Sequence, residues 1–289
     1  MTVSIGAKTE VLIEALPWIQ QYEEKTFVVK YGGAAMVEED LRETFAQDVT
    51  ILKKIGIRMV IVHGGGREIT EIAQKLGLST RFVDGQRYTD EPMMEVVQMV
   101  LAGKTNKDIV ARINQHDGEA VGLCGLDVHL LKARRQRPRQ GDLGLVGEIT
   151  EVNTEYLELL LGNGIMPVIA PIAVGTEGEV LNVNADIAAG AIASALASEK
   201  LVYLSDVPGV MSGTELIHSI DRPMARDLIE SGVIGAGMVP KLHSAFNALE
   251  SGVRKVHMID GRVKHSLLLE IFTDEGVGTQ IVSQPEERP

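Results

Sequence analysis

Short apolar runs and stretches with helical periodicity alternate along most of the chain. In residues 39–56, Leu41, Phe45, Val49 and Leu52 fall on one helix face, and a glycine ends the segment. The apolar runs predict buried strands within residues 26–30, 58–63, 164–174, 200–205 and 253–260. The periodic stretches predict further helices within residues 67–77, 92–115, 186–200 and 240–252. Residues 120–150 are expected to form short strands and glycine turns.

This alternation is typical of α/β proteins, so we predict a mainly parallel central sheet sandwiched by helices in three αβα layers. In such sheets, ligands bind beyond the carboxyl ends of the strands. The chain has no internal repeat and no low-complexity linker. Any division into lobes is expected just before the helix that begins near Asp186.

The N-terminal segment is predicted to be a separate helix. Residues 10–22 place Leu12, Leu16, Ile19 and Tyr22 at helical spacing. Proline lacks a backbone N–H, so the proline at position 17 is expected to start, kink or interrupt this helix. The helix either packs on the body of the protein or is offered to a partner chain.

The composition disfavours several functions. The chain has 289 residues and a formal net charge of −12, which opposes binding to nucleic acids and anionic membranes. The basic stretch at 132–139 lacks aromatic residues for base stacking and is interpreted as a solvated loop. Cys124 is the single cysteine, so no intrachain disulfide can form, and no Cys/His metal spacing exists. No signal peptide or membrane span is recognisable, so a cytoplasmic protein is expected.

Two glycine-rich loops follow predicted strands. Gly32 and Gly33 follow the first strand, and Gly64 and Gly65 follow the second. Backbone N–H groups in such loops attract phosphate, especially where a helix begins. Each loop alone could equally be a tight turn, but two loops in one α/β domain favour phosphate binding. Neither matches the Walker or GxGxxG fingerprint, which disfavours a Walker ATPase and a standard Rossmann dehydrogenase.

Two lysines occupy positions that local preferences disfavour. Lys30 ends an apolar strand, and Lys241 follows Pro240 in a first helical turn, where a cation opposes the helix dipole. Either lysine alone could be a snorkelling surface side chain. Both lie where an α/β sheet gathers ligands, so we expect them to share one phosphoryl group. Asp186 is interpreted as the N-cap of its helix and could also hold both lysines in position.

Three further polar segments are candidates for ligand binding. Arg87 follows a glycine-containing turn, and its planar guanidinium suits a carboxylate. Asn182 precedes the alanine-rich helix, and its amide can both donate and accept hydrogen bonds. Ser205, Asp206 and Gly209 follow a buried strand and could line an adenine or ribose pocket, although a turn explains them equally.

Six short motifs occur in one order: "KYGGAAM", "VHGGG", "GQRYT", "NVNAD", "SDVPGV" and "GMVPK". In this order and approximate spacing they resemble the amino acid kinase family, and the resemblance spans nearly the whole chain. It implies the amino acid kinase fold and a kinase that moves the γ-phosphoryl group of ATP to the side-chain carboxylate of N-acetyl-L-glutamate, a step in arginine biosynthesis. Mg²⁺ would be held mainly by the nucleotide phosphates.

The resemblance also implies roles for the candidate residues. Lys30 and Lys241 would stabilise the transferring phosphoryl group, and Asp186 would organise them. Arg87 and Asn182 would hold the α-carboxylate and the acetamido end of the substrate. The amides that face the phosphates and the acyl phosphate would be those of Gly32, Gly33, Gly64 and Gly65. The residues that contact ATP would be Ser205, Asp206 and Gly209.

The segment 260–281 resembles the C-terminal signature of arginine-inhibited members of this family. Those members carry an extra N-terminal helix that interlaces dimers into a hexamer, a trimer of dimers. Here residues 1–25 would supply that helix, 26–181 would form a lobe for the amino-acid substrate and dimerisation, and 182–289 would form a lobe for ATP and arginine. The residues expected around arginine are Tyr22, His265, Glu270 and Gly276. A plain terminal helix and turn is the alternative.

Two departures from the family pattern concern the substrate loops. Arg67-Glu68 follows the second glycine loop, where the resemblance implies a proline, and "GLCGLDVHLL" differs from the usual Gly-Lys-Asp type of stretch. A same-fold kinase for acetylated or carrier-linked aminoadipate is therefore an alternative. A non-catalytic arginine sensor is an alternative of another class, but the presence of both lysines and Asp186 argues against it.

Overall fold

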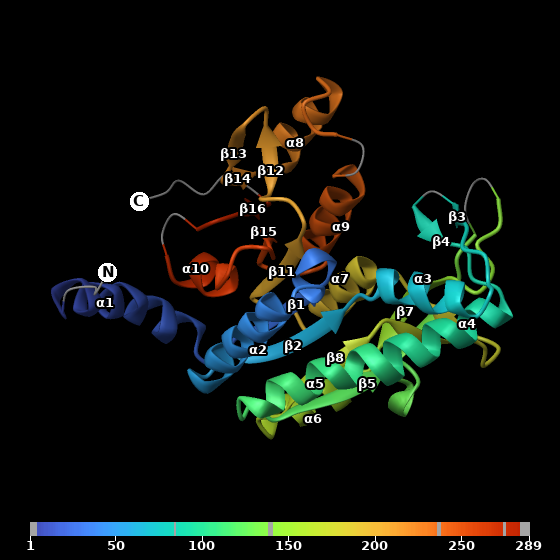
Figure 1. Cartoon of the computed structure of the whole chain (residues 1–289). Coiled ribbons are helices and arrows are strands. Elements are labelled where there is room, and N and C mark those ends of the chain that lie inside the picture. The colour runs from blue at the N-terminus through green and yellow to red at the C-terminus, as the bar shows by residue number, and fades with distance from the viewer. Residues whose placement is uncertain (1–4, 84, 138–140, 236–237, 274–275, 284–289) are drawn as a thin grey trace.

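The computed structural model describes residues 5–83, 85–137, 141–235, 238–273 and 276–283. Its centre is an eight-stranded sheet in the order β14-β16-β15-β11-β1-β2-β8-β5 (Figure 1). Every neighbouring pair in this sheet is parallel except β15 with β16. The strands are β14 (Ser219–Ile220), β16 (Thr279–Ile281), β15 (Lys255–Asp260), β11 (Lys200–Ser205), β1 (Thr26–Tyr31), β2 (Arg58–His63), β8 (Met166–Ala170) and β5 (Ala120–Cys124). The predicted mainly parallel sheet is confirmed.

A smaller sheet and two hairpins complete the strands. The second sheet has the order β10-β9-β6-β7, and its strands are β10 (Val180–Asn182), β9 (Ile172–Gly175), β6 (Leu131–Arg135) and β7 (Gly147–Val152). The hairpins pair β3 (Phe82–Val83) with β4 (Gln86–Arg87), and β12 (Val210–Ser212) with β13 (Glu215–Ile217). The prediction of one strand at 164–174 is wrong, because Pro171 separates β8 from β9 and the two strands join different sheets.

Most helices occupy predicted segments, but those at 154–162 and 222–230 were not predicted. The helices are α1 (Ile5–Tyr22), α2 (Glu39–Lys54), α3 (Gly66–Lys75), α4 (Glu91–Gln98), α5 (Asn106–Gln115), α6 (Thr154–Gly162), α7 (Ala185–Ala195), α8 (Arg222–Glu230), α9 (Val239–Glu250) and α10 (Ser266–Phe272). Short 3₁₀ turns form η1 (Gly33–Met36) and η3 (Asp127–His129). Between α4 and α5 the chain forms a π-helix, η2 (Met99–Thr105), which periodicity alone did not predict.

Alternate residues of the central strands pack on opposite faces of the sheet. Phe27 and Val29 of β1 belong to one apolar cluster, which includes residues of α2, α5 and α10. Val28 belongs to the other cluster, which includes residues of α6, α7 and α9. Figure 1 shows the helices on the two sides of the sheet. The three-layer αβα prediction is therefore confirmed.

Helix α1 extends from the body beside α10 (Figure 1). Pro17 lies inside this helix, so of the three expectations (a start, a kink or an interruption) the structure excludes the start and the interruption. The carbonyl that loses its hydrogen bond belongs to Ile13, whose side chain is 65% exposed, so water can hydrate that carbonyl. In the described part of the chain, no helix combines the length and apolarity needed to cross a membrane.

The strand order separates early from late parts of the chain. Strands β1, β2, β8 and β5 form one half of the central sheet, and β11, β15, β16 and β14 form the other half. The halves meet where β1 pairs with β11. Ligand sites in α/β sheets lie beyond the carboxyl ends of strands at such a reversal of strand order.

Candidate functional site

Lys30, Asp186 and Lys241 lie together near the carboxyl ends of β1 and β11. The Lys30 Nζ atom is 3.0 Å from Oδ1 of Asp186. The Lys241 ammonium donates a hydrogen bond of 2.6 Å to Oγ of Ser205, the last residue of β11. Burial lowers the pKa of Lys241, while the Asp186 carboxylate raises it and the Lys30 ammonium lowers it further. The two ammonium groups and the carboxylate therefore share one electrostatic environment.

The start of α7 leaves the Asp186 carboxylate free to face Lys30. The interpretation of Asp186 as the N-cap is wrong, because Asn184 caps the helix. Its Oδ1 accepts hydrogen bonds from the backbone N–H groups of Asp186, at 2.8 Å, and Ile187, at 3.3 Å. Asp186 lies in the first turn, where a carboxylate also favours the helix dipole.

The first glycine loop packs directly against these charges. A Cβ atom on Gly32 would lie 2.8 Å from Lys30 Nζ, so a side chain there would displace the ammonium. Gly33 has φ +69°, and a Cβ atom there would overlap the carboxylate of Asp206. The loop after β1 and the loop after β11 are thus in contact, as expected if both face one ligand.

The carboxylates around Lys241 belong to Asp186 and Asp206, and both raise its pKa. In the described residues no group of three or more His, Cys, Asp or Glu side chains is placed to hold a metal ion.

Gly209, predicted to contact ATP, has φ +154° and packs against Thr279, whose Oγ1 accepts a hydrogen bond of 2.8 Å from the N–H of Val210. The observed contact of Gly209 therefore packs the turn after β11 against strand β16.

The second glycine loop differs in one respect from the prediction. The N–H of Gly64 donates a hydrogen bond of 2.8 Å to the carbonyl of Tyr31, so this amide is already engaged. Gly65 has φ +155°, and a Cβ atom there would lie 2.5 Å from Cδ2 of Leu101, so only glycine fits. No hydrogen bond to the Gly65 N–H is found within the described residues.

All four predicted substrate residues line one cavity of about 200 Å³, namely Gly64, Gly65, Arg87 and Asn182. Arg87 is only 8% exposed, and burial lowers its pKa. Its Nη2 donates to the carbonyl of Gly66 and to Oγ1 of Thr70, both at 2.7 Å. Its Nη1 is buried and has no hydrogen-bond partner among the residues that the structure describes. A ligand with an anionic group would satisfy this nitrogen.

The cavity also contains residues that the sequence analysis did not select. Leu101 on the π-helix η2 and Phe82 on β3 supply apolar walls, and Val146 and Pro171 add to them. Apolar lining residues resemble core residues in sequence, so only their position beside the glycine loop could have indicated them. The amide of Asn182 is itself oriented, since its Nδ2 donates to Oγ1 of Thr89 at 3.1 Å.

Three of the four residues expected around arginine line a second, smaller cavity of about 60 Å³: Tyr22, Glu270 and Gly276. His265 does not line it, because its Nδ1 lies 2.7 Å from Oδ1 of Asp48. Oε1 of Glu270 lies 2.6 Å from Nδ1 of His257, and its Oε2 accepts hydrogen bonds from the N–H groups of Val277 and Gly278. His257 Nε2 is buried without a partner among the described residues.

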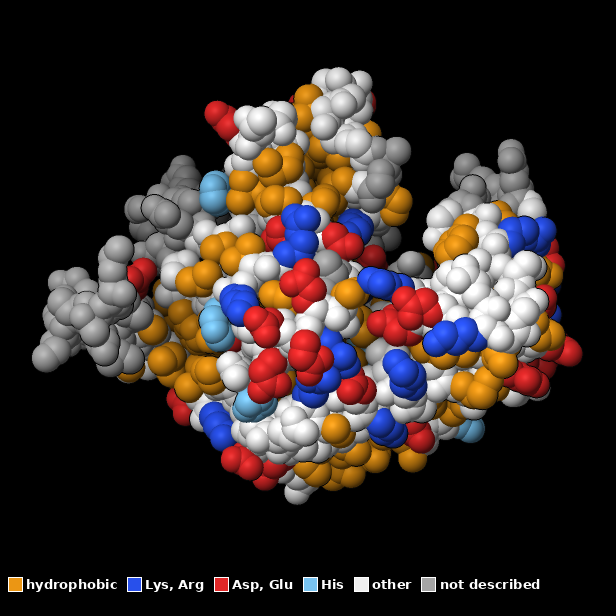
Figure 2. All heavy atoms as spheres, viewed as in Figure 1, with side chains coloured by type: hydrophobic (Ala, Val, Ile, Leu, Met, Phe, Trp, Pro, Cys, Tyr) orange, Lys and Arg blue, Asp and Glu red, His pale blue; other side chains and the backbone are white. Residues whose placement is uncertain are grey.

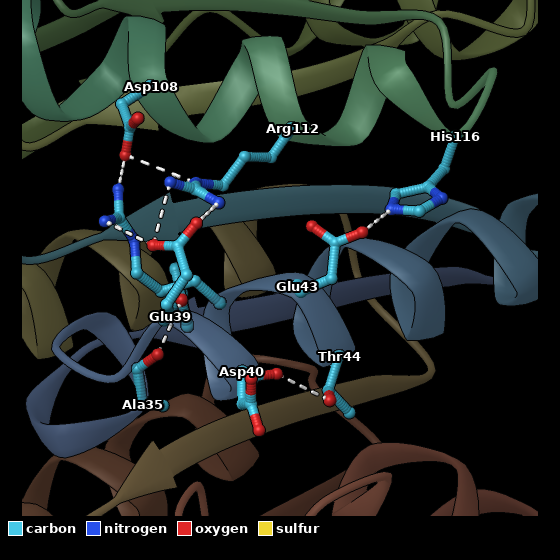
Figure 3. A network of polar contacts seen from close by, with 10 residues as sticks. Ala35, Glu39, Asp40, Glu43, Thr44, Asp108, Arg112 and His116 are labelled. Carbon is cyan, nitrogen blue, oxygen red and sulfur yellow. Dashed lines mark hydrogen bonds and ion pairs between the residues drawn. The ribbon is translucent and has the colours of Figure 1, made fainter.

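A charged network joins α2 to α5 next to the first glycine loop. Figure 2 shows acidic and basic side chains interspersed over this face, and Figure 3 shows the contacts. The pairs are Glu39–Arg112, Arg42–Asp108 and Glu43–His116. Single exposed ion pairs contribute little, but a network of them fixes the relative position of two helices.

Comparisons with known proteins agree with this arrangement. Residues 25–260 match the model of the amino acid kinase family. The chain belongs to the amino acid kinase family. It is therefore an enzyme, a kinase of this family, and its central sheet and flanking helices form the amino acid kinase fold.

Two acetylglutamate kinases are similar to this chain over nearly their whole length, and a solved synthase structure is similar over about two thirds of its length. The acetylglutamate kinase of Chlorobium chlorochromatii is 55% identical over 274 residues, which cover 95% of this chain and 96% of that protein. The acetylglutamate kinase of Aquifex aeolicus is 54% identical, with 95% and 97% covered. The solved N-acetylglutamate synthase of Neisseria gonorrhoeae, complexed with coenzyme A and N-acetyl-glutamate, is 27% identical with a TM-score of 0.85. This chain covers 65% of that synthase, and the synthase structure covers 98% of this chain.

Proposed function

We propose that this kinase transfers the γ-phosphoryl group of ATP to the side-chain carboxylate of N-acetyl-L-glutamate, giving N-acetyl-L-glutamyl 5-phosphate. The two relatives described above carry the name of this activity. The observation that carries the proposal is the buried Arg87, which lines a cavity beside a glycine loop and whose Nη1 has no hydrogen-bond partner among the described residues. A guanidinium in this state suits the α-carboxylate of an amino acid.

The remaining cavity walls fit the other end of such a substrate. Asn182 offers an oriented amide for an acetamido group, and Leu101 and Phe82 offer apolar contact to its methyl group and chain. The reacting carboxylate would then extend past Gly65 toward Lys30. It is ionised at neutral pH, so the reaction needs no general base.

Lys30 and Lys241 would neutralise the charge that spreads over the transferring phosphoryl group, and Asp186 would hold both ammonium groups. ATP would lie over the loops after β1 and β11, with Ser205 and Asp206 beside its phosphates. Mg²⁺ held by the nucleotide would supply further charge neutralisation between the phosphates. Catalysis then consists of positioning and electrostatic stabilisation.

We propose that the two halves of the sheet bind different substrates. In this proposal residues 26–181 bind the amino-acid substrate and residues 182–289 bind ATP, with phosphoryl transfer where β1 meets β11. The hinge between them would lie near Asn182, which contributes to the substrate cavity while the adjacent α7 carries Asp186.

The direct test measures ATP consumption with N-acetyl-L-glutamate and traps the acyl phosphate with hydroxylamine. The acceptor panel includes N-acetyl-L-aspartate, N-acetyl-2-aminoadipate and L-glutamate. The proposal requires the highest kcat/KM for N-acetyl-L-glutamate and hydroxamate formed in proportion to ADP. Preference for the aminoadipate would establish the same-fold alternative, and turnover of none would remove the proposal.

The smaller cavity supports a regulatory site for arginine. Glu270 offers a carboxylate for a guanidinium, and the largely buried Lys200, 4.8 Å from the ring of Tyr22, offers a charge for a carboxylate. We expect L-arginine, but not L-citrulline, to inhibit the enzyme. Glu270→Gln should relieve inhibition without changing the uninhibited rate, and equal inhibition of that variant would exclude this site.

Helix α1 supports assembly through interlaced N-terminal helices. Ile13 and Leu16 are 65% and 52% exposed, whereas Trp18 and Tyr22 of the same helix line the arginine cavity. We propose that the exposed residues pack against α1 of another dimer to give a hexamer. Sedimentation of the double variant Ile13→Glu/Leu16→Glu should show dimers, and an unchanged hexamer would contradict the interlacing.

A further inference from the structure

His63 is a buried titratable residue beside the second glycine loop. It is the last residue of β2, and none of its side chain is exposed. Its Nδ1 lies 2.7 Å from the carbonyl oxygen of Gly64, and its Nε2 lies 3.2 Å from Nδ2 of Asn106. Asn106, the first residue of α5, is also fully buried.

The hydrogen-bond partners of His63 and Asn106 fix the position of the proton on the imidazole. Nδ2 of Asn106 lies 2.9 Å from the carbonyl oxygen of Val168, which can only accept a hydrogen bond, so this side of the amide is the NH₂ group. Its Oδ1 accepts from the ammonium of Lys107 at 3.2 Å. The other N–H of this group faces Nε2 of His63 at 3.2 Å, and the carbonyl oxygen of Leu123 lies at 3.4 Å. The carbonyl oxygen of Gly64 can only accept a hydrogen bond, so the proton of the neutral imidazole lies on Nδ1, is donated to Gly64, and leaves Nε2 as an acceptor for Asn106. Burial lowers the pKa of His63 to about 4, which keeps the ring neutral at physiological pH.

This hydrogen bond determines where the next N–H points. The carbonyl of Gly64 and the N–H of Gly65 belong to one planar peptide and point in opposite directions. Because the carbonyl is held by an imidazole inside the core, the N–H points away from the core, and both glycines line the substrate cavity. Glycine peptides reorient at low cost, so a free loop would not maintain this direction.

We propose that His63 and Asn106 are positioning residues that hold the Gly64–Gly65 peptide so that the Gly65 N–H faces the carboxylate being phosphorylated. The proposal rests on the proposed function and adds a donor that the glycine loop alone would not keep in place. Gly64 cannot supply that donor, because its N–H is bonded to Tyr31. A donor held in place before the reaction stabilises developing charge without reorganisation.

Helix α5, which carries Asn106, is itself held in place by ion pairs. Asn106 begins α5, and two residues of the same helix, Asp108 and Arg112, contact Arg42 and Glu39 at the start of α2 (Figure 3). Helix α2 follows the first glycine loop and its 3₁₀ turn η1. Helix α5 therefore contacts both loop regions. Its first residue, Asn106, supports the second glycine loop, and its exposed face contacts helix α2, which follows the first glycine loop.

Two substitutions at position 63 separate positioning from packing. In His63→Asn the side-chain NH₂ occupies nearly the place of Nδ1 and can still donate to Gly64, although the volume is smaller. His63→Leu fills the site better but has no donor. We expect kcat to fall at least about tenfold in His63→Leu and at most about threefold in His63→Asn, with the KM for ATP little changed in both.

The opposite order of rates, or equal losses in both variants at equal thermal stability, would show that His63 only fills the core and would overturn the proposal. The wild-type enzyme is assayed in parallel. If it fails to phosphorylate N-acetyl-L-glutamate, the proposed function falls, whereas normal wild-type turnover with an unaffected His63→Leu variant removes only the positioning role.

The second measurement does not depend on a leucine variant that folds. In the ¹⁵N spectrum of the wild-type imidazole, Nδ1 of His63 should carry the proton. Asn106→Asp presents a carboxylate to Nε2, which should move the proton to Nε2 and lower kcat. Asn114→Asp is the matched control on the same helix, since within the described residues the Asn114 side chain bonds to the backbone of Ala120 and not to His63, and it should keep the wild-type rate and spectrum. A proton on Nε2 in the wild type would overturn the proposal.

Discussion

Lys30 and Asp186 form an ion pair of 3.0 Å between β1 and the first turn of α7, which are separated by more than half of the chain. Lys241, from α9, lies within the field of the same carboxylate. Like charges repel, so bringing two ammonium groups to one place raises the free energy of the empty site. A phosphoryl group between them would remove that repulsion, and Asp186 reduces it until the substrate arrives.

Replacing this carboxylate should damage catalysis more than folding. In Asp186→Asn the cap of α7 remains, because Asn184 supplies it. We expect kcat to fall by about 10²-fold with a small change in the free energy of unfolding, since the lysines lose their common partner. In Lys30→Ala and Lys241→Ala we expect kcat to fall by at least as large a factor. Asp227→Asn, an exposed residue of α8, is the control, and a near-normal rate in Asp186→Asn would remove Asp186 from the mechanism.

A methyl group on Gly32 should move the Lys30 ammonium without breaking the loop. Its Cβ atom would lie 2.8 Å from Lys30 Nζ, and the backbone there does not require positive φ. We expect Gly32→Ala to lose at least about tenfold in kcat while its stability stays within about 1 kcal/mol of wild type. Gly162→Ala, where a Cβ atom meets no atom within 4 Å, should keep full activity. Equal rates in both variants would show that the ammonium tolerates displacement.

The sequence predicted the layers, most helices and the gathering of the two lysines. It succeeded because apolar periodicity is local and because the ends of parallel strands meet at one edge of a sheet. Position along the chain singled out Lys30, and the family resemblance implied the roles of Asp186 and Arg87. The structure places Lys30 and Asp186 in contact and Arg87 in the wall of the neighbouring cavity.

The remaining features depend on contacts that no single segment encodes. The cap of α7 at Asn184 rather than Asp186 depends on a shift of two residues, which two polar candidates separated by one alanine leave open. The engagement of the Gly64 amide by Tyr31 depends on how β1 and β2 align. The expectation for His265 came from the resemblance of the C-terminal segment to arginine-inhibited relatives, whereas in the structure its backbone is left-handed and its side chain contacts Asp48.

Arg87 should act in substrate binding and not in the chemical step. Its Nη2 already bonds to Gly66 and Thr70, and only a planar guanidinium keeps a second nitrogen, Nη1, available for a ligand beside these bonds. In Arg87→Lys we expect the KM for N-acetyl-L-glutamate to rise at least about tenfold, near 1.4 kcal/mol, with kcat and the KM for ATP changed little. Arg67→Lys, an exposed residue paired with Glu71, is the matched control. A loss confined to kcat would place Arg87 in the chemistry instead.

Two buried histidines should make the protein sensitive to acid. Burial lowers the pKa of His63 and of His257 to about 4, below the ordinary value of 6.5. Between these values the unfolded chain binds more protons than the native protein, so the free energy of unfolding decreases as the pH falls from 6.5 to 4. Each histidine contributes up to about 3 kcal/mol to this loss.

Asp48 acts in the opposite direction. Burial raises its pKa to about 6, so the native protein binds its proton first and gains stability over part of the same range. With two histidines against one carboxyl group, we expect a net decrease in urea denaturation free energy between pH 7 and pH 4.5. His63→Asn removes one titrating group and should flatten this decrease, whereas His243→Asn, on the exposed side of α9, should leave it unchanged. An equally steep decrease in His63→Asn would show that His63 does not become protonated on unfolding in this range.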